Sequence, residues 1–341
     1  MLSYLLNDMR MEKRCIKPYK VDVAVRVMIW TRPECQIKQF EIIKEAAPRI
    51  LFLISDGGRN EDEKRKILES RKIVEEIDWD CEVHKLYFEE NQGMYTMMKK
   101  QRDFIWSKVD RCIFLEDDYI PAVSFFSYCA ELLDKYKDDE RIEMITGNNP
   151  FEYYSDAEPY DYFFTENGWS VWGTACWKRT IDNREYPFDY SDSKYIRRCL
   201  NDNATWFWRK KINNYCDGKL DDNHVPGGEY YHAANSILFH RLSIVPTRNM
   251  IQNIGFDGAH FSSKSGRGSN ILNIPVHEID RPIRHPKYVV DDKHYSEMYE
   301  KLLNHKPVKL FITRALNFIK LVLTGKALTV IKRKIRPEIE K

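Results

Sequence analysis

Three consecutive carboxylates, Glu116, Asp117 and Asp118, directly follow the apolar segment Arg111–Leu115. Oxygen ligands crowded at one point suit a hard divalent cation such as Mg²⁺ or Mn²⁺, which can neutralise a diphosphate. The apolar segment has the composition of a strand, and open α/β sheets bind ligands at the carboxyl ends of their strands. In the alternative interpretation, Asp117 or Asp118 caps a helix that we expect from Ser124. Taken alone, the acidic run is compatible with both.

The segments around this run alternate between strand and helix patterns. Apolar and β-branched runs predict strands at Val21–Trp30, Arg49–Ser55, Cys81–Tyr87, Arg111–Leu115 and Ile142–Thr146. Helices are predicted between them, at Glu34–Ala47, Asn60–Ile77, Tyr95–Lys108 and Ser124–Lys137. This alternation is typical of an α/β fold in which a mostly parallel sheet carries helices on both faces.

Beyond Asn149 the chain is rich in Tyr, Asp, Asn and Trp, with scattered short helical segments. Aromatic faces stack on rings, and amides and carboxylates form hydrogen bonds, so this composition suits a pocket for polar, ring-shaped ligands. No internal repeat or low-complexity linker separates the two halves. We therefore expect them to share one core.

The composition of the whole chain indicates a globular protein and excludes several classes of protein. Its 341 residues are 43% hydrophobic and 31% charged, as in globular proteins. A formal net charge of +2 argues against a nucleic-acid-coating protein, and we expect no nucleic-acid partner. The eight cysteines lie far apart without a CxxC pair, so we expect free thiols in a reducing cytoplasm and no structural zinc.

The basic residues are concentrated near the C-terminus. Lys301–Pro337 holds ten Lys or Arg and no acidic residue, and Lys309–Thr324 has the pattern of an amphipathic helix with basic edges. An anionic membrane surface attracts such a segment by about 1 kcal/mol per basic residue. No stretch reaches the roughly eighteen apolar residues that span a bilayer, and Met1–Lys20 lacks a signal-peptide core. We therefore expect a cytoplasmic protein, peripheral on the inner face of the cell membrane; a docked helix or a homo-oligomer interface is the alternative.

Several short motifs occur in a fixed order along Val21–His260. They are Phe52–Gly58 with Asp56-Gly57-Gly58, Asn91-x-Gly93, Glu116-Asp117-Asp118, Gly147-Asn148-Asn149, Gly168–Trp177, Leu242–Pro246 and Asn249–Phe256. In this order they resemble the GT-A fold glycosyltransferases. Within that group they look most like bacterial nucleotide-diphospho-sugar transferases, which are similar to family 2 glycosyltransferases and to N-acetylglucosaminyltransferase I. The resemblance implies a Rossmann-like GT-A fold with a mixed, mostly parallel sheet. The resemblance also implies a nucleotide-binding half (21–150) and an acceptor and donor-sugar half (151–275). The residue pattern adds a polar lead-in (1–20) and a C-terminal extension with a basic amphipathic helix (276–341).

The same resemblance implies the residues that bind the donor. Metal ligands for Mn²⁺ or Mg²⁺ would be Asp118, Asp117 and His260, although a lone histidine is more often structural. Nucleotide and donor-sugar contacts would come from Thr31, Arg32, Asp56, Asn91, Arg102, Glu116, Asp117, Trp169 and Trp172. The alternatives are turn chemistry for Asp56, a structural role for Arg102 and core packing for the tryptophans, which we prefer for Trp177.

The family also carries an acidic general base about fifteen residues before the segment Leu242–Pro246. That position falls on Glu229, which stands where the family has Asp and lacks the preceding Trp. A glutamate can still act as the base on an acceptor hydroxyl. Asp222 and Asp221 are the other candidates.

Together these implications predict a metal-dependent hexosyltransferase. It would move a sugar from a nucleotide diphosphate, a UDP-sugar by expectation, to a hydroxyl of a cell-surface glycan or lipid-linked oligosaccharide, with inversion. A sugar nucleotidyltransferase is one alternative, but it would want a Gly-rich phosphate loop, which Trp30–Pro33 is not. A non-catalytic, membrane-docked glycan-binding or scaffold protein with the same fold is the other.

Overall fold

The computed structural model describes residues 17–166, 172–182, 192–216, 228–255 and 274–303. The chain divides into two units, Met1–Ser296 and Glu297–Lys341, and the sheets and the site described below belong to the first. None of the described helices is long and apolar enough to cross a membrane.

The first half folds as alternating strands and helices where the sequence predicts them. The elements are β1 (Val21–Ile29), α1 (Pro33–Ala46), β2 (Pro48–Ser55), α2 (Glu61–Val74), β3 (Glu82–Tyr87), α3 (Met94–Trp106) and β4 (Arg111–Leu115). Pro33 begins α1, where its missing N–H costs nothing. Asn60 caps α2, because its side chain accepts a hydrogen bond from the backbone N–H of Glu63.

The rest of the chain includes the predicted helix that begins at Ser124 and the predicted strand Ile142–Thr146, and it adds strands that the sequence did not predict. The elements are β5 (Tyr119–Pro121), α4 (Ser124–Lys135), β6 (Ile142–Thr146), the 3₁₀ turn Ser155–Ala157, β7 (Tyr162–Thr165), β8 (Thr174–Trp177), α5 (Lys178–Asp182), α6 (Lys194–Asn203), α7 (Trp206–Cys216), α8 (Gly228–Phe239), β9 (Leu242–Pro246), β10 (Ile251–Asn253) and α9 (Lys293–Leu303). Tyr162–Thr165 and Thr174–Trp177 are strands of four residues, too short for a periodicity to show.

Eight strands form one mixed, mostly parallel sheet in the order β3-β2-β1-β4-β8-β6-β9-β7. Strands β1 to β4 pair in parallel, and so do β6 and β9, whereas β8 and β7 run antiparallel to their neighbours. The strand order reverses between β1 and β4, which is where doubly wound sheets bind their ligands, beyond the carboxyl ends of the strands. The predicted fold class, an α/β fold around a mostly parallel sheet, is confirmed.

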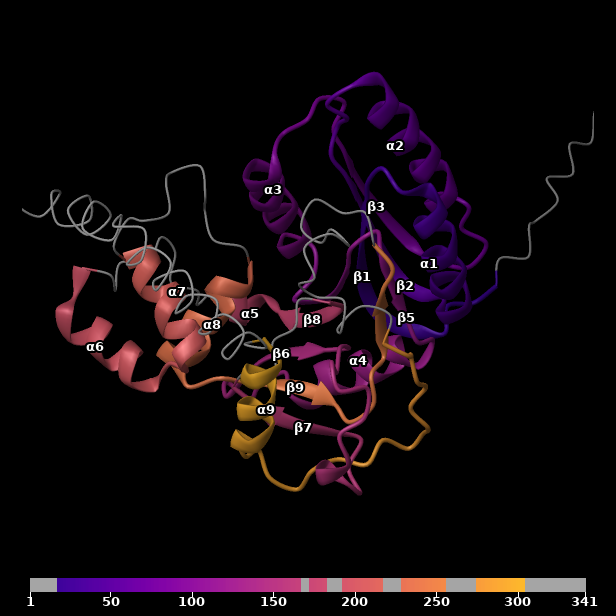
Figure 1. Ribbon diagram of the computed structural model, residues 1–341. Coiled ribbons are helices and arrows are strands. Elements are labelled where there is room, and N and C mark those ends of the chain that lie inside the picture. Colours follow the sequence, from indigo (N-terminus) through magenta and orange to yellow (C-terminus); the bar gives the residue numbers. More distant parts are fainter. Residues whose placement is uncertain (1–16, 167–171, 183–191, 217–227, 256–273, 304–341) are drawn as a thin grey trace, which may run out of the picture. The chain divides into compact units, whose positions relative to one another are not determined.

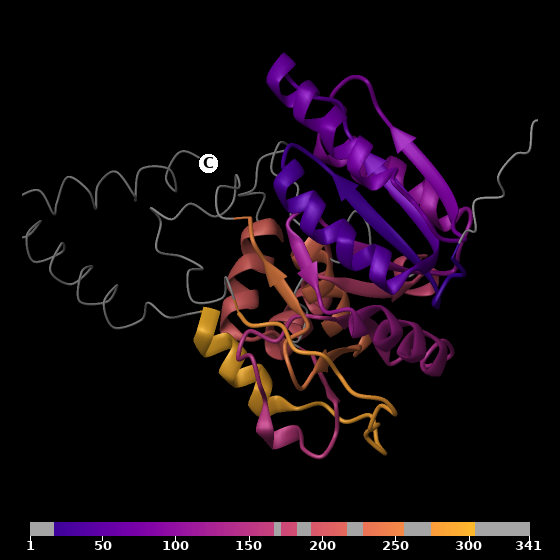
Figure 2. The same ribbon diagram turned by 90° about the vertical axis from the view of Figure 1, so that its right-hand side faces the viewer.

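Helices cover both faces of this sheet. Apolar side chains of α1, α2 and α4 form a core on one face, and those of α3, α6, α7 and α8 form a second core on the other. Figure 1 shows α1 and α2 on one side of β1–β3 and α3 on the other. In Figure 2 the indigo and purple strands of the first half lie side by side. Because β7, β8 and β9 belong to the same sheet, the two halves share one core, as the sequence predicts.

A small second sheet crosses the carboxyl edge of the large one. Strand β10 pairs antiparallel with β5, with Asn253 opposite Tyr119. Two glycines let this sheet approach, because a Cβ at Gly147 or at Gly173 would lie 2.4 or 2.5 Å from the side chain of Ile251. The close approach brings the end of β10 next to the residues that follow β4.

Candidate functional site

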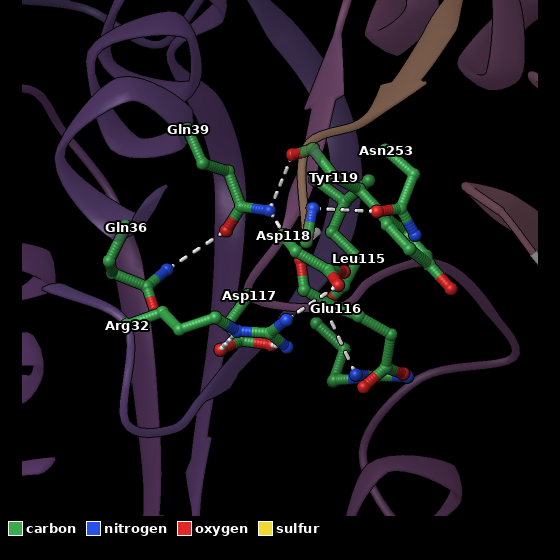
Figure 3. A network of polar contacts seen from close by, with 11 residues as sticks. Arg32, Gln36, Gln39, Leu115, Glu116, Asp117, Asp118, Tyr119 and Asn253 are labelled. Carbon is green, nitrogen blue, oxygen red and sulfur yellow. Dashed lines mark hydrogen bonds and ion pairs between the residues drawn. The ribbon is translucent and has the colours of Figure 1, made fainter. Parts of the chain in front are cut away.

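The acidic run lies in a turn at the carboxyl end of β4. The backbone N–H of Tyr119 donates to the carbonyl of Glu116 at 3.2 Å, so Asp117 and Asp118 occupy the two central positions of the turn. Gln39 of α1 donates through Nε2 to the carbonyls of Glu116 and Tyr119, at 2.5 and 2.7 Å (Figure 3). A buried amide of α1 therefore fixes the backbone that presents both aspartates.

Arg32, which directly precedes α1, pairs with both aspartates. Its Nη2 and Nε lie 2.6 and 2.8 Å from the two carboxylate oxygens of Asp117, and its Nη1 lies 2.9 Å from Oδ2 of Asp118 (Figure 3). The carboxyl ends of β1 and β4 bring these residues together, because the two strands are neighbours in the sheet although 85 residues separate Arg32 from Asp117. One guanidinium thus bridges the pair.

Burial sets the electrostatics of this cluster. The side chains of Asp117 and Asp118 are only 4% and 12% exposed, whereas that of Arg32 is 26% exposed. Burial, and then the negative charges of Asp117 and Glu116, raise the pKa of Asp118 to about 6, although the charge of Arg32 opposes the rise. Burial lowers the pKa of Arg32, but Asp117 and Asp118 outweigh that effect and raise it above its usual value. The arginine therefore stays charged.

Glu116 does not join the two aspartates. Its side chain lies 2.8 Å from Nη2 of Arg26, a buried residue of β1 that also donates to the carbonyl of Leu115. This ion pair holds the first carboxylate of the run away from the Arg32 guanidinium. The acidic run thus provides a pair of carboxylates at one point, not three.

The segment after β10 closes over Asp118. The backbone N–H of Ile254 donates to the carbonyl of Asp118 at 3.0 Å, and the N–H of Gly255 donates to Oδ1 of Asn253 at 2.8 Å. A Cβ at Gly255 would lie 2.1 Å from Oδ2 of Asp118 and 2.5 Å from Nη1 of Arg32. Only glycine fits this position without displacing the ion pair.

The helix-cap interpretation of the aspartates is wrong. Strand β5 separates them from α4, and the first N–H groups of that helix have another partner. Glu278 accepts from the backbone N–H of Val123 at 3.0 Å and from that of Ser124 at 2.7 Å. Asp117 and Asp118 are therefore not needed to cap α4.

Asp56 and Asn91 lie together at the neighbouring strand ends. Oδ1 of Asp56 accepts from the backbone N–H groups of Gly57 and Gln92, both at 2.8 Å, and Oδ2 accepts from Nδ2 of Asn91 at 3.2 Å. The same amide of Asn91 donates to the carbonyl of Gly57. The turn chemistry considered as the alternative for Asp56 is present, and a nucleotide contact stays a prediction for both residues.

Three other predicted donor residues have different surroundings. Thr31 lies half-buried in the turn after β1, beside Arg32. Arg102 is exposed on α3 and pairs with Asp103 of the same helix, and its diphosphate contact stays a prediction. Trp172 is 7% exposed within the hydrophobic core, which agrees with the core-packing alternative, and its donor-sugar contact stays a prediction. Trp177 is buried, as we preferred.

The remaining predicted residues are described only in part. Trp169, Asp221, Asp222 and His260 lie outside the described residues. Glu229 is the second residue of α8, and the structure describes its backbone alone.

The far end of α8 contacts the start of β6. Near the far end of the helix, Ser236 donates to the buried Glu143, which lies close to the start of β6, at 2.5 Å. Strand β6 runs parallel to β4, because both pair antiparallel with β8. A position of Glu229 near the acidic turn stays a prediction.

The aspartate pair has the donor chemistry for Mg²⁺ or Mn²⁺. Such cations are usually bound by one or two carboxylates together with substrate phosphates, not by a closed protein cage. Within the described part of the chain, no three His, Cys, Asp or Glu side chains form a cluster that could hold a metal. The pair thus fits a cation that arrives with a diphosphate, provided that Arg32 gives way.

Two hollows of the described surface lie elsewhere. One, of about 530 Å³, is lined by residues at the amino ends of β1–β4, such as Asp22, Glu82 and Arg111. The other, of about 340 Å³, lies along β7 and is lined by Tyr160 and Tyr288 among others. Neither is lined by Arg32 or by the aspartate pair. The assignment of the site is therefore based on the chemistry of these residues and on their position in the sheet.

Sequence reasoning missed several residues that build this site. Gln36 donates to Gln39, and both amides are fully buried on α1. Their spacing of three on the buried side of a helix was an available signal, because polar residues are buried when they have partners. The pairing of Arg32 with the aspartates carried no local signal.

Searches against protein-family models and against curated proteins give no match. Among solved structures, the chain is similar to apo mouse xyloside xylosyltransferase 1, with 9% identity and a TM-score of 0.32 over 53% of this chain and 76% of that chain. It is similar to UDP-glucose pyrophosphorylase complexed with UDP-glucose, with 10% identity and a TM-score of 0.25 over 44% of this chain and 64% of that one. It is also similar to glucosyl-3-phosphoglycerate synthase from Mycobacterium tuberculosis in complex with Mn²⁺, UDP and phosphoglyceric acid, with 12% identity and a TM-score of 0.24 over 37% and 42%. At these TM-scores, function has to be argued from the chain's own residues.

Proposed function

We propose that this chain is a glycosyltransferase that moves a sugar from a nucleotide diphosphate to a hydroxyl acceptor. The observation that carries the proposal is the Arg32–Asp117–Asp118 cluster at the point between β1 and β4 where the strand order reverses. A carboxylate pair and an arginine at this point are the groups that hold a cation and a diphosphate.

The net charge of the cluster favours a nucleotide diphosphate that binds together with a divalent cation. Two carboxylates and one guanidinium leave one net negative charge, which repels a free diphosphate. A divalent cation on Asp118, with Asp117 close by, would reverse that sign. When bound there, it supplies stabilisation of the negative charge that develops on the leaving diphosphate. We infer that the nucleotide binds together with Mn²⁺ or Mg²⁺.

Arg32 contributes directly to binding the diphosphate. A guanidinium has five N–H bonds, and three of those of Arg32 point at the aspartates. The other two have no partner among the described residues, and the side chain is partly exposed. They can donate to phosphate oxygens, which guanidinium groups bind well.

Glu229 is the proposed general base. It stands in the first turn of α8, and a carboxylate that reaches the acceptor hydroxyl would remove its proton. Direct attack of that hydroxyl on the anomeric carbon would invert its configuration. The acceptor we propose is a surface glycan or a lipid-linked oligosaccharide, and the donor a UDP-sugar.

Thermal shift with a panel of nucleotide sugars, with and without Mn²⁺, tests the donor. Ligands that bind the native state raise the midpoint of unfolding, so we expect a shift with UDP-sugars that depends on Mn²⁺ and is lost in Asp118→Asn. Release of UDP in the presence of an acceptor then tests transfer. Stabilisation by a nucleoside triphosphate and a sugar phosphate instead would favour the nucleotidyltransferase alternative. Binding without any turnover would favour the scaffold alternative.

Glu229→Gln tests the base. A general base acts in the transfer step, so this variant should keep its UDP-sugar affinity while turnover falls by about 100-fold or more. Asp221→Asn and Asp222→Asn are the matched comparisons and should lose much less. Near wild-type transfer by Glu229→Gln, with either aspartate variant inactive, would move the base to the other loop.

A further inference from the structure

The two aspartates hold Arg32 unequally. Asp117 accepts two hydrogen bonds from the guanidinium, at 2.6 and 2.8 Å, whereas Asp118 accepts one, at 2.9 Å. Asp117 is also the more deeply buried of the two, with a side chain 4% exposed against 12%. A paired fork is stronger and more directional than a single contact. The Arg32–Asp118 contact is therefore the one that breaks first.

We propose that Arg32 is an internal counter-cation that competes with the divalent cation for Asp118 and stays bound to Asp117 when the cation enters. A guanidinium and a divalent cation repel each other at one carboxylate, so the two cannot both lie on Oδ2 of Asp118. Gly255 closes one side of that oxygen, because a Cβ at this residue would lie 2.1 Å from it. Asp117 keeps its partner because it is costly for a buried carboxylate to lose a charged partner, and Arg32 is the one that Asp117 has among the described residues.

This competition couples the metal to the nucleotide. The free protein binds the cation weakly, because Arg32 must first leave Asp118. A diphosphate offers the released Nη1 group of Arg32 a new acceptor, so the nucleotide increases the affinity for the metal. Because binding coupling is reciprocal, the metal increases the affinity for the nucleotide by the same factor. This consequence rests on the proposed function in that the anion is taken to be a nucleoside diphosphate. Asp117 is then the positioning residue of Arg32, and Asp118 is the metal ligand.

Titration of the free protein with Mn²⁺, followed by the electron paramagnetic resonance of unbound Mn²⁺, tests the competition. Arg32→Gln removes the competing charge and should bind Mn²⁺ about tenfold more tightly than wild type. With Mn²⁺ present, the same variant should bind UDP about tenfold more weakly, because the donor to the diphosphate is lost. The factor by which UDP increases Mn²⁺ affinity should fall accordingly. Arg65→Gln, an exposed arginine of α2, is the matched control and should change none of these values.

The double variant Arg32→Gln/Asp117→Asn covers the case in which Arg32→Gln fails to fold. It removes both partners of the buried fork, so that Asp118 is the one charged residue of the three that remains. It too should bind Mn²⁺ more tightly than wild type. Mn²⁺ binding that is unchanged or weaker in the folded variants overturns the proposal. Absence of UDP binding to wild type with Mn²⁺ counts against the proposed function alone, because the Mn²⁺ titration of the free protein uses no nucleotide.

Discussion

At the scale of single residues, Gly255 shows how little space surrounds the aspartate pair. A methyl group at this position would lie 2.1 Å from Asp118 Oδ2, well inside van der Waals contact. The Asn253 side chain holds the backbone of Gly255 in place, so the backbone cannot simply withdraw. The site therefore depends on the absence of a side chain as much as on the charged groups.

Gly255→Ala should lower the free energy of unfolding by about 1–3 kcal/mol, the usual range for overpacking. It should also weaken Mn²⁺-dependent UDP binding, because Asp118 and Arg32 are displaced. Urea unfolding and a nucleotide titration measure the two effects. In an Asp118→Ala background the cost of Gly255→Ala should be much smaller, because the crowded carboxylate is gone. An equal cost in both backgrounds would show that the strain comes from elsewhere.

At the scale of elements, α4 depends on a distant residue for its N-terminus. Glu278 binds the N–H groups of Val123 and Ser124, and the hydroxyl of Ser124 in turn accepts from the N–H of Ile279. This reciprocal contact ties residues 278–279 to a helix that forms part of the main core.

Glu278→Ala should destabilise the protein by about 1 kcal/mol, since a helix cap and a favourable charge at the helix N-terminus are lost together. Chemical denaturation measures the change. Glu69→Ala on α2 is the control, because the side chain of Glu69 is more than half exposed. It should lower the free energy of unfolding by less than half as much. Equal effects of the two substitutions would argue against the cap.

His285 joins α4 to β7 and should make stability depend on pH. Its Nδ1 contacts the hydroxyl of Tyr162 at 2.9 Å and its Nε2 lies 3.0 Å from Glu131, contacts that the neutral ring with its proton on Nε2 satisfies. Burial and then the charge of Lys135 lower the pKa of His285, while the charges of Glu131 and Asp161 oppose this.

Because the folded pKa lies below that of the unfolded chain, the unfolded state takes up the proton first as the pH falls. The stabilising contribution of His285 is therefore complete above about pH 6.5 and is lost as the pH drops towards the folded pKa. His285→Gln cannot titrate, so its free energy of unfolding should decline less than that of wild type between pH 7.5 and pH 5.5. Parallel declines in urea unfolding would contradict this assignment.

At the scale of the whole molecule, the basic C-terminal segment is predicted to bind an anionic membrane surface. Lys301–Pro337 contains ten basic residues and no acidic residue. Residues 304–341 lie outside the described part of the chain, so membrane binding by the tail stays a prediction from the sequence.

Deletion of Val308–Lys341 should release the protein from vesicles that contain anionic lipid. Wild-type binding should weaken as salt rises, because exposed charges are screened within about 10 Å at 0.1 M ionic strength. Co-sedimentation measures both effects, with vesicles of neutral lipid as the control. Full-length protein that ignores anionic vesicles at low salt would favour the alternative of a helix docked on protein.

The sequence by itself determined the elements of the first half and the position of the acidic turn. Strands β1 to β4 and helices α1 to α3 follow from local patterns of apolar periodicity and turn residues, which neighbouring residues alone create. The alternation of strands and helices then dictated a parallel sheet, and the sheet dictated that Asp117 and Asp118 lie at a carboxyl edge.

Only the tertiary structure decided how these side chains are paired. Arg32 meets Asp117 and Asp118, Glu116 turns to Arg26, and Glu278 caps α4, all across at least 85 residues of sequence. Strand order created these contacts, because β1 and β4 become neighbours only when the sheet forms, and no local pattern encodes the partner of a charged side chain. The same reason explains the short strands β7 and β8, which are stable only because the sheet supplies their hydrogen-bond partners. The sequence therefore predicted which residue types form the site. The pairing of their charges depends on the folded sheet.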